Sequence, residues 1–358
     1  PLLVRTGRGT RPVLVEPNGV SVEAPSDEAV VVNAGAHAFA RVRYDEELLG
    51  RITRSLDGLS TEERTQLVDD AWASVVGGRS SAADFCRFAG AFGGETELTV
   101  WSALLQGIGW CDRFLDGAPR EHFRAWVRGL AGPALERIGW EPRADEPDLT
   151  RSLRGMLLTG LAVLGADPNA QALAREVEIE ARSDKAVDPS LAAASIAIVA
   201  AGGGPEEYET FLRASRTSRT PQEQLRYLFA LPEFRDAVLM DRTVALGLTD
   251  DVRPQNAPWV FARAIANRDV GERAWRFVKE HWEEIVARCA PSTVVFAADG
   301  VRYLTEPDLV RDAEAFFAGH PIPQSALQLR QILERQRING DLRRRAAPDL
   351  QTFFSAAD

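Results

Sequence analysis

The fold is decided by residues 30–45, which read VVVNAGAHAFARVRYD. Three β-branched valines favour a strand, and the Asn-Ala-Gly that follows has the chemistry of a turn. Beyond the turn, Phe39, Arg41 and Arg43 alternate with other residues at the strand period of two. Asp45 is a good N-cap, and two glutamates follow it where the helix dipole favours carboxylates. The stretch therefore predicts a strand, a turn and a second strand that lead into a helical body.

The residues before this stretch predict further strands. Residues 2–6 and 12–16 are two short β-like runs around a glycine-containing turn, and residues 20–23 alternate again after Pro-Asn-Gly. With the two strands of the opening stretch, the pattern amounts to about five strands. We therefore expect residues 1–44 to form a small β-sandwich, or part of one.

From residue 45 onward the signals are helical. Ser60 and Glu63 form a capping box before an apolar helical face, and prolines start a series of shorter helices further along. Residues 95–115 and 271–288 are long amphipathic segments. Caps and breakers indicate about fifteen helices with short connections. The predicted fold class is mainly α, with residues 45–358 forming an α-superhelix of HEAT-like antiparallel helix pairs.

Composition argues against several classes of function. The 358 residues carry 42 basic and 52 acidic side chains, and a net charge of −10 disfavours a nucleic-acid or anionic-membrane surface. No apolar run reaches the length of about 20 residues that spans a membrane. Three widely separated cysteines indicate neither a disulfide framework nor a zinc finger, so we expect a reducing, cytoplasmic location. Because a strand-like run follows Pro1 directly, we also expect a piece of a longer polypeptide.

No motif for independent catalysis is present. None of the four histidines belongs to an HExxH sequence, in which two imidazoles one helical turn apart hold zinc. The sequence also lacks GxSxG, the strained turn that exposes a serine nucleophile. Cys86 lies between two phenylalanines, which favours a packed thiol over a nucleophile. We therefore expect neither a catalytic residue nor a metal site in this chain.

Several segments resemble, in order, the C-terminal region of zinc aminopeptidases of the aminopeptidase N family, which includes the endoplasmic-reticulum aminopeptidases. Residues 33–45 are similar to the family's Asn-x-x-Gly-Phe-Tyr-Arg-Val-x-Tyr junction, and residues 94–97 are similar to its Glu-Thr-Glu helix start. Residues 267–282 resemble the family's Gly-x-x-x-Ala-Trp-x-Phe-x-x-x-x-Trp helix, which is the most specific match. Residues 315–317 and 329–334 resemble its closing Phe-Phe and terminal helices.

The resemblance implies a division of roles along a longer polypeptide. In the family, a catalytic domain with HExxH and GxMEN motifs precedes this region and holds the zinc, and neither motif occurs here. Residues 1–44 would be the last part of a β-sandwich, and residues 45–358 would be the whole ERAP-like helical domain. In the family, that domain forms a bowl that closes over the active site and limits peptide length. The implied partners are a peptide substrate and the missing N-terminal and catalytic domains of the same polypeptide.

The resemblance also implies four substrate contacts. The family's basic residue that holds the peptide's C-terminal carboxylate corresponds to Arg113, and a tyrosine beside it in some members corresponds to Asp112. A second family arginine corresponds to Asn267, with Arg268 one position on. Because an arginine can clamp a carboxylate through two hydrogen bonds, both arginines are candidate peptide-binding residues. The alternative is that they are exposed and merely paired with acidic neighbours.

Three functional hypotheses follow. The first is the non-catalytic C-terminal portion of a zinc aminopeptidase, which closes the peptide chamber, contributes to substrate binding and selects peptide length. Catalysis would then belong to the parent enzyme, whose zinc-activated water removes N-terminal residues. The second is a free-standing helical-repeat scaffold that binds a protein partner on its concave face. The third, a thiol hydrolase that uses Cys86 or Cys111, has the least support.

Overall fold

A computed structural model describes residues 1–25, 27–183 and 185–355. Its sheet is small and antiparallel, with the strand order β2-β1-β3. The strands are β1 (Leu2–Thr6), β2 (Gly9–Val13) and β3 (Val31–Val32). Val4 of β1 is buried and lies opposite Val32. Pro12 lies in the edge strand β2, where a residue without an N–H is tolerated.

The rest of the chain is mostly helical, as predicted. The helices are α1 (Glu46–Thr53), α2 (Thr61–Val76), α3 (Ala82–Ala89), α4 (Leu98–Asp112), α5 (Gly117–Ile138), α6 (Asp148–Thr159), α7 (Pro168–Arg182), α8 (Pro189–Gly202), α9 (Pro205–Thr217), α10 (Pro221–Ala230), α11 (Ala237–Leu246), α12 (Ala257–Ala266), α13 (Gly271–Glu280), α14 (Trp282–Arg288), α15 (Pro307–Gly319) and α16 (Ala326–Ser355). Two 3₁₀ segments matter below: η5 (Leu231–Glu233) and η6 (Val294–Tyr303). Asp45 and Ser60 cap α1 and α2 through their side chains, as the sequence predicts. The long helix predicted over residues 271–288 is interrupted at His281, where φ is −110° and ψ is 20°.

Two of the five predicted strands are absent from the sheet. Residues 39–44 instead lie alongside α2, where the N–H of Val42 donates to Asp70 Oδ2 at 3.1 Å. A side chain of the helix thus satisfies a backbone group that a neighbouring strand would otherwise have to pair. Residues 20–23 also lie outside the three strands. The prediction of five strands in this segment is therefore wrong, although the period of two in the sequence is real.

The junction between the sheet and the helices depends on one buried carboxylate. Asn33 and Gly35 have left-handed backbones, with φ of 59° and 73°, so the predicted turn is present. The N–H of Gly35 donates to Glu63 Oε1 at 2.8 Å, and Arg5 Nη2 donates to Glu63 Oε2 at 2.7 Å. Glu63 also closes the predicted capping box with Ser60. One side chain of α2 therefore joins β1, the turn and the helix start.

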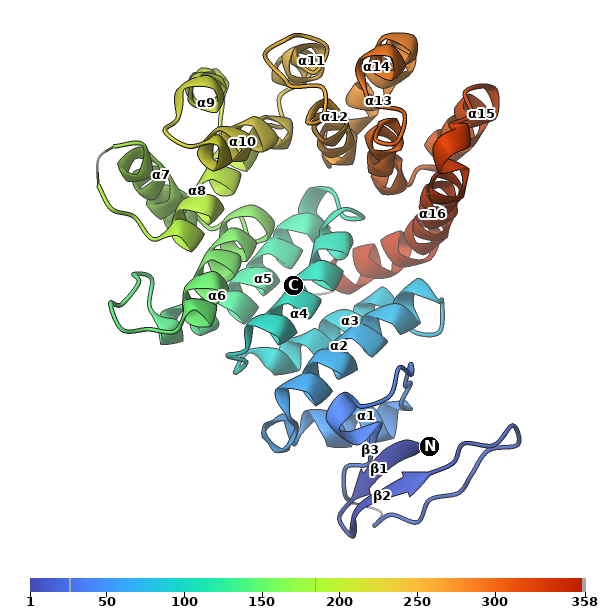
Figure 1. Ribbon diagram of the computed structural model, residues 1–358. Helices are drawn as coiled ribbons and strands as arrows, with labels where there is room; N and C mark the ends of the chain where they lie inside the picture. The colour runs from blue at the N-terminus through green and yellow to red at the C-terminus, as the bar shows by residue number, and fades with distance from the viewer. Residues whose placement is uncertain (26, 184, 356–358) are drawn as a thin grey trace.

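The helices follow a curved path, and α16 returns to the N-terminal helices (Figure 1). Two hydrophobic cores lie along this path. The first core is formed by residues between 31 and 198 together with the C-terminal half of α16. The second core is formed by residues between 196 and 332. Because α8 and α16 contribute to both cores, these two helices connect the halves of the molecule. The HEAT-like character of the helix pairs stays a prediction.

The end of α16 packs into the first core. The ring of Phe354 makes edge contacts with Phe123 and Trp126, at centroid distances of 5.4 and 6.0 Å. Nearby, Asp349 Oδ2 accepts a hydrogen bond of 2.8 Å from the N–H of Ala83. Helices that are far apart in the sequence are thereby joined. In the described ranges, no helix is long and apolar enough to cross a membrane.

Candidate functional site

A cavity of about 350 Å³ lies where residues of both halves of the molecule meet. Its walls come from the C-terminal end of α4, the π-helical segment η4 (Gly160–Leu164) that follows α6, η5, the loop between α12 and α13, and the end of η6. All four residues that the resemblance implied line this cavity, although about 155 positions separate the two pairs in the sequence. The lining residues are Gln106, Gly109, Trp110, Asp112, Arg113, Val163, Leu164, Glu233, Arg235, Ala266, Asn267, Arg268 and Tyr303.

Arg113 is held in the cavity by backbone groups and rings. It is the C-cap residue of α4. Its Nη1 donates to the carbonyl oxygen of Ala266 at 3.0 Å, and its Nη2 donates to that of Tyr303 at 3.2 Å. The guanidinium carbon lies 5.0 Å from the centre of the Tyr303 ring, which is stacked on Trp110. These contacts fix the position of the guanidinium, but none of them neutralises its charge.

The charge of Arg113 persists at neutral pH. Burial lowers the pKa of this guanidinium to about 10, which still leaves it protonated at pH 7. Within residues 1–25, 27–183 and 185–355, no carboxylate forms an ion pair with it. A partly buried cation without a counter-charge is costly unless a ligand or water supplies one. Arg113 is therefore a candidate anion-binding group.

The carboxylate of Asp112 pairs with two neighbouring arginines. Its carboxylate is buried and accepts two hydrogen bonds from Arg120, at 2.8 Å from Nε and 3.0 Å from Nη2. Arg268 Nε lies 3.2 Å from the second carboxylate oxygen. Both oxygens of Asp112 are thus occupied by cationic side chains. Asp112 therefore orients Arg120 and Arg268, and neither of its oxygens is left free to accept a hydrogen bond from a ligand.

Arg268 joins the loop before α13 to the end of α4. Its Nη1 donates to Asp269 Oδ1 at 2.7 Å, and its Nη2 donates to Asp116 Oδ1 at 3.0 Å and to the carbonyl oxygen of Leu115. Its side chain is only 14% exposed. Neither this arginine nor Arg113 is fully exposed, but Arg268 does pair with Asp112 and Asp269, the acidic neighbours named in the alternative considered from the sequence.

Asn267 is occupied on both sides of its amide. Its Nδ2 donates to the carbonyl oxygens of Pro232 and Phe234, at 2.8 and 3.1 Å. Its Oδ1 accepts from the N–H groups of Asp269 and Val270, at 3.0 and 3.1 Å. The side chain therefore fixes η5 to the start of α13. Of the four implied residues, Arg113 keeps the most capacity for a ligand.

Glu233 was not found from the sequence, because residues 231–235 (LPEFR) carry no motif. Burial raises the pKa of this carboxyl, and the charges of Arg263, Arg235 and Arg113 oppose that rise. Arg235 is itself paired with Asp269, at 3.2 Å. Glu233 makes no hydrogen bond or ion pair with any other side chain in the described part of the chain. In the described residues, the cavity thus contains a carboxyl group and an arginine that form no ion pair, and the charge of that arginine acts on the carboxyl.

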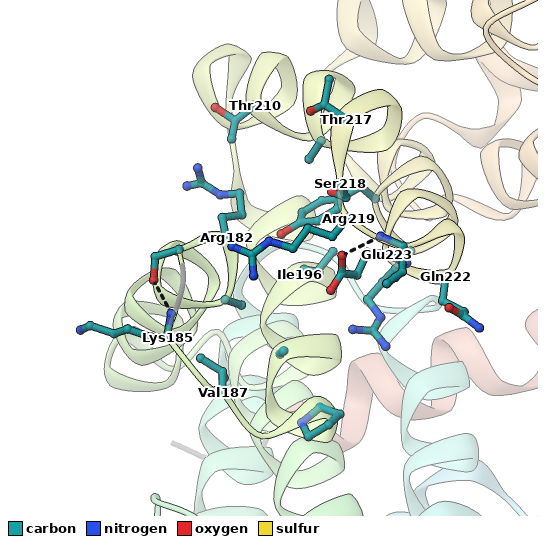
Figure 2. Close-up of a pocket in the computed structure, with 18 of the residues that line it drawn as sticks. Arg182, Lys185, Val187, Ile196, Thr210, Thr217, Ser218, Arg219, Gln222 and Glu223 are labelled. Atoms are coloured by element: carbon teal, nitrogen blue, oxygen red, sulfur yellow. Dashed lines mark hydrogen bonds between the residues drawn. The ribbon is translucent and has the colours of Figure 1, made fainter.

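A larger cavity, of about 610 Å³, lies between the α7–α8 connection and the α9–α10 connection (Figure 2). It contains none of the residues implied by the resemblance. Arg182 is bound through two hydrogen bonds to Glu178, and Lys185 is paired with Glu180. Glu223, labelled in Figure 2, accepts the N–H of Thr220 at the start of α10. Two further arginines of its lining, Arg213 and Arg226, form no ion pair in the described ranges of the chain. We place the candidate site in the smaller cavity because all four residues implied by the resemblance line it.

The donor set of the candidate site does not suit a metal ion. In the part of the chain that the structure describes, no three His, Cys, Asp or Glu side chains are grouped as ligands would be. Catalytic zinc sites use three such side chains. The arginines and the stacked rings of the cavity instead suit an organic ligand that carries an anionic group.

Comparison with known proteins identifies relatives over most of the chain. It is 27% identical to aminopeptidase M1-A of Oryza sativa subsp. japonica over 335 residues, which are 89% of this chain and 38% of that protein. It is 25% identical to aminopeptidase M1 of Arabidopsis thaliana over 325 residues, 87% of this chain and 37% of that protein. It is 23% identical to the alanine/arginine aminopeptidase of Saccharomyces cerevisiae over 314 residues, which are 86% of this chain and 37% of that protein. The chain therefore spans less than two fifths of the length of these relatives.

The family assignment rests on a match to a family model over most of the chain. Residues 29–338 match the ERAP1-like C-terminal domain family, from just before β3 into the middle of α16. The match includes every residue that lines the candidate cavity. The chain thus belongs to the ERAP1-like C-terminal domain family, whose members here are the C-terminal regions of aminopeptidases.

Proposed function

We propose that this chain is the non-catalytic C-terminal portion of a zinc-dependent aminopeptidase. It closes the peptide chamber, contributes to substrate binding and takes part in selecting peptide length. The parent enzyme removes N-terminal residues from peptides, with its zinc in a catalytic domain that is not part of this sequence. Membership of the ERAP1-like C-terminal domain family and relatives named as aminopeptidases support this proposal.

One observation carries the role of the cavity: Arg113 is fixed in position by backbone oxygens but forms no ion pair with a carboxylate of the described residues. A peptide's C-terminal carboxylate supplies one negative charge and two acceptor oxygens, which match the fork of a guanidinium. The N–H groups of Arg113 that do not bind carbonyl oxygens remain available for it. The stacked Trp110 and Tyr303 place apolar ring surface beside the guanidinium. An attraction between opposite charges is stronger beside such surface than in water.

A fixed carboxylate site also explains how length is selected. An extended peptide spans at most about 3.3–3.6 Å per residue. A peptide whose C-terminus is bound at Arg113 presents its N-terminus to the catalytic domain only when it is long enough to reach. Shorter peptides engage one site and not the other. The partners under this proposal are therefore the peptide and the catalytic domain of the same polypeptide.

The cysteines suit a reducing location for this enzyme. Cys86, Cys111 and Cys289 are buried free thiols, and Cys86 Sγ lies 4.0 Å from Cys111 Sγ. Burial and the neighbouring thiol raise the pKa of Cys111, which disfavours a reactive thiolate. The proposed location is accordingly the cytoplasm. A role for these thiols in hydrolysis has no support from their surroundings.

The test is a calorimetric titration of the purified chain with one synthetic peptide, prepared as the free acid and as the C-terminal amide. We expect the acid to bind about tenfold more tightly, because the amide removes the charge that Arg113 recognises. Arg113→Gln should weaken binding of the acid by a similar factor. The matched control is Arg276→Gln, which removes a charge from an exposed i,i+4 pair on α13.

Two results would contradict the proposal. Equal affinity for acid and amide, unchanged by Arg113→Gln, would favour the scaffold hypothesis over a carboxylate site. Turnover of aminoacyl-nitroanilides by the chain with added zinc, retained through further purification, would show that it is catalytic after all. Because Arg113 also ties α4 to α12 and η6, Arg113→Lys serves as a second variant that keeps the charge. Circular dichroism verifies that each variant is folded.

A further inference from the structure

The larger cavity, of about 610 Å³ between the α7–α8 and α9–α10 connections, is lined mainly by cations among its charged side chains (Figure 2). Of the lining residues that the structure describes, Glu223 alone is acidic. The basic ones are Arg182, Lys185, Arg213, Arg219 and Arg226. The whole chain has a net charge of −10, so this cluster has the opposite sign to the molecule as a whole. Because like charges around one cavity repel each other, the arrangement favours an anionic ligand.

Two of these cations are neutralised within the fold. Arg182 donates to both carboxylate oxygens of Glu178, at 2.6 and 3.1 Å. The hydroxyl of Tyr227 donates to the same carboxylate at 3.2 Å. Lys185 is paired with Glu180. The buried carboxylate of Glu178 is therefore already engaged by Arg182 and Tyr227, and it does not serve the remaining arginines of the cavity.

Arg213 of α9 and Arg226 of α10 form no ion pair in the described ranges of the chain. Glu209 lies one turn before Arg213 and is paired with Arg242 at 2.6 Å. Glu223 lies one turn before Arg226 and is engaged in the capping box at the start of α10. The two helices pack against each other. Among the described residues, two guanidinium groups from neighbouring helices are thus left for a ligand in one cavity.

The anion that suits two guanidinium groups is a phosphoryl group. It carries about two negative charges at neutral pH and three acceptor oxygens, whereas a single arginine satisfies both oxygens of a carboxylate. Thr220 adds a donor, because its Oγ1 accepts the N–H of Glu223 at 3.2 Å and its O–H remains available. Val187 and Ile196 supply apolar wall for an organic portion of the ligand. The volume lies within the range of roughly 300–1,000 Å³ that is usual for small-molecule pockets.

We propose that this cavity binds a small organic phosphate, with the phosphoryl oxygens held by Arg213 and Arg226. The site shares no lining residue with the cavity around Arg113, and it does not depend on the function proposed above. Ile196, on its wall, belongs to α8, the helix that contributes to both hydrophobic cores. A phosphate ester bound here therefore contacts an element that connects the two halves of the molecule.

The experiment uses phenyl phosphate, benzoate and inorganic phosphate as probes, at constant ionic strength. Affinity is measured from the rise of the thermal unfolding midpoint with probe concentration, because a ligand of the folded state stabilises that state. Phenyl phosphate should bind about tenfold more tightly than benzoate, which keeps the ring and replaces the phosphoryl group by a carboxylate. Arg213→Gln and Arg226→Gln should each weaken its binding about tenfold. The matched control Arg216→Gln, which removes a charge from α9 that is paired with Asp251, should leave binding unchanged.

Three results would overturn this proposal. Equal midpoint shifts in the parent chain and in both arginine variants would show a general salt effect. Benzoate binding as tightly as phenyl phosphate would show a carboxylate site, as for an acidic peptide. Inorganic phosphate binding as tightly as phenyl phosphate would show that the ligand is free phosphate and has no organic portion.

Two further measurements keep the test sharp. Arg213→Lys keeps the charge without the planar fork and should retain part of the affinity, and circular dichroism verifies that each variant is folded. Arg213→Gln and Arg226→Gln should leave unchanged the preference for the free-acid peptide over its amide, which belongs to Arg113. Failure of the phosphate proposal therefore leaves the proposed function standing.

Discussion

The two hydrophobic cores are alike in their interiors and differ from the cavity between them. Trp101 is fully buried in the first core and donates to the carbonyl oxygen of Glu95 at 3.0 Å. Trp275 is fully buried in the second core and donates to Asp312 Oδ2 at 2.6 Å. The cavity, by contrast, is lined by charged side chains, and among the described residues Arg113 and Glu233 form no ion pair. Apolar packing holds each half together, whereas ion pairs of Arg268 contribute to the contact between the halves.

A similar contrast separates a buried carboxylate, Glu63, from a partly buried one, Glu233. Glu63, at the junction with the sheet, accepts hydrogen bonds from Arg5, Gly35 and Ser60, and these outweigh the effect of burial and lower its pKa. Glu233, in the cavity, has no such donors, and burial raises its pKa. The carboxylate that joins the sheet to the helices is thus satisfied by hydrogen bonds from its neighbours, whereas Glu233 is acted on only by the charges of nearby arginines.

The largest effect on the free energy of unfolding is expected from disrupting the apolar packing of the end of α16 in the first core. Phe354→Ala removes a buried ring from the contact with Phe123 and Trp126 and should lower the free energy of unfolding by about 3 kcal/mol. Hydrogen exchange should then accelerate in α3 and α5 and not in α9 to α14, because only the first core loses packing. Phe353→Ala, at a partly exposed neighbour, is the control and should have a smaller effect. Uniform acceleration in both halves would show that the two cores form one cooperative unit.

A smaller effect is expected from breaking the charged contact between the halves. Arg268→Gln removes the ion pairs with Asp112 and Asp116 and should lower the free energy of unfolding by about 1.5 kcal/mol in low salt. The loss should shrink as salt is added. Arg273→Gln, which breaks an exposed pair with Asp241, should cause no measurable change in urea denaturation. If Arg268→Gln lowered the free energy of unfolding as much as Phe354→Ala, the distinction between apolar packing and polar contact would be contradicted.

The smallest effect is expected at Glu233, and it has the opposite sign. Because its folded pKa is raised, the stability linked to this carboxyl is fully present below its ordinary value of 4.5 and is lost as the pH rises through the folded pKa. Glu233→Gln should therefore be more stable than the parent by about 1 kcal/mol at pH 7, and the difference should vanish in acid. Unfolding midpoints at neutral and acidic pH measure this. A variant that is less stable at pH 7 would mean that the carboxylate has a partner within the protein.

Parts of the fold that depend on local chemistry could be predicted. Asp45 and Ser60 cap helices because their side chains reach N–H groups only three residues away. The turn at Asn33 and Gly35 follows from residues that tolerate positive φ. The alternation over residues 39–44 was misleading, because the groups that satisfy this segment lie on α2, far along the chain. The period of two in the sequence shows which side chains share a face. It does not show which group will accept or donate the backbone hydrogen bonds of the segment.

The candidate site also contains residues that could be identified from the sequence and others that could not. Arg113 and Arg268 were identified because the surrounding motifs resemble a known family, and the structure brings them into one cavity from opposite halves of the chain. Glu233 could not be identified, since no residue near it in the sequence shows that η5 packs against α12 and that its side chain lines the cavity. Helix starts, the turn and the apolar faces are properties of neighbouring residues, so the order of amino acids was enough to determine them. Burial, missing counter-charges and the meeting of residues 112 and 268 arise from packing between distant elements, so only the tertiary structure could decide them.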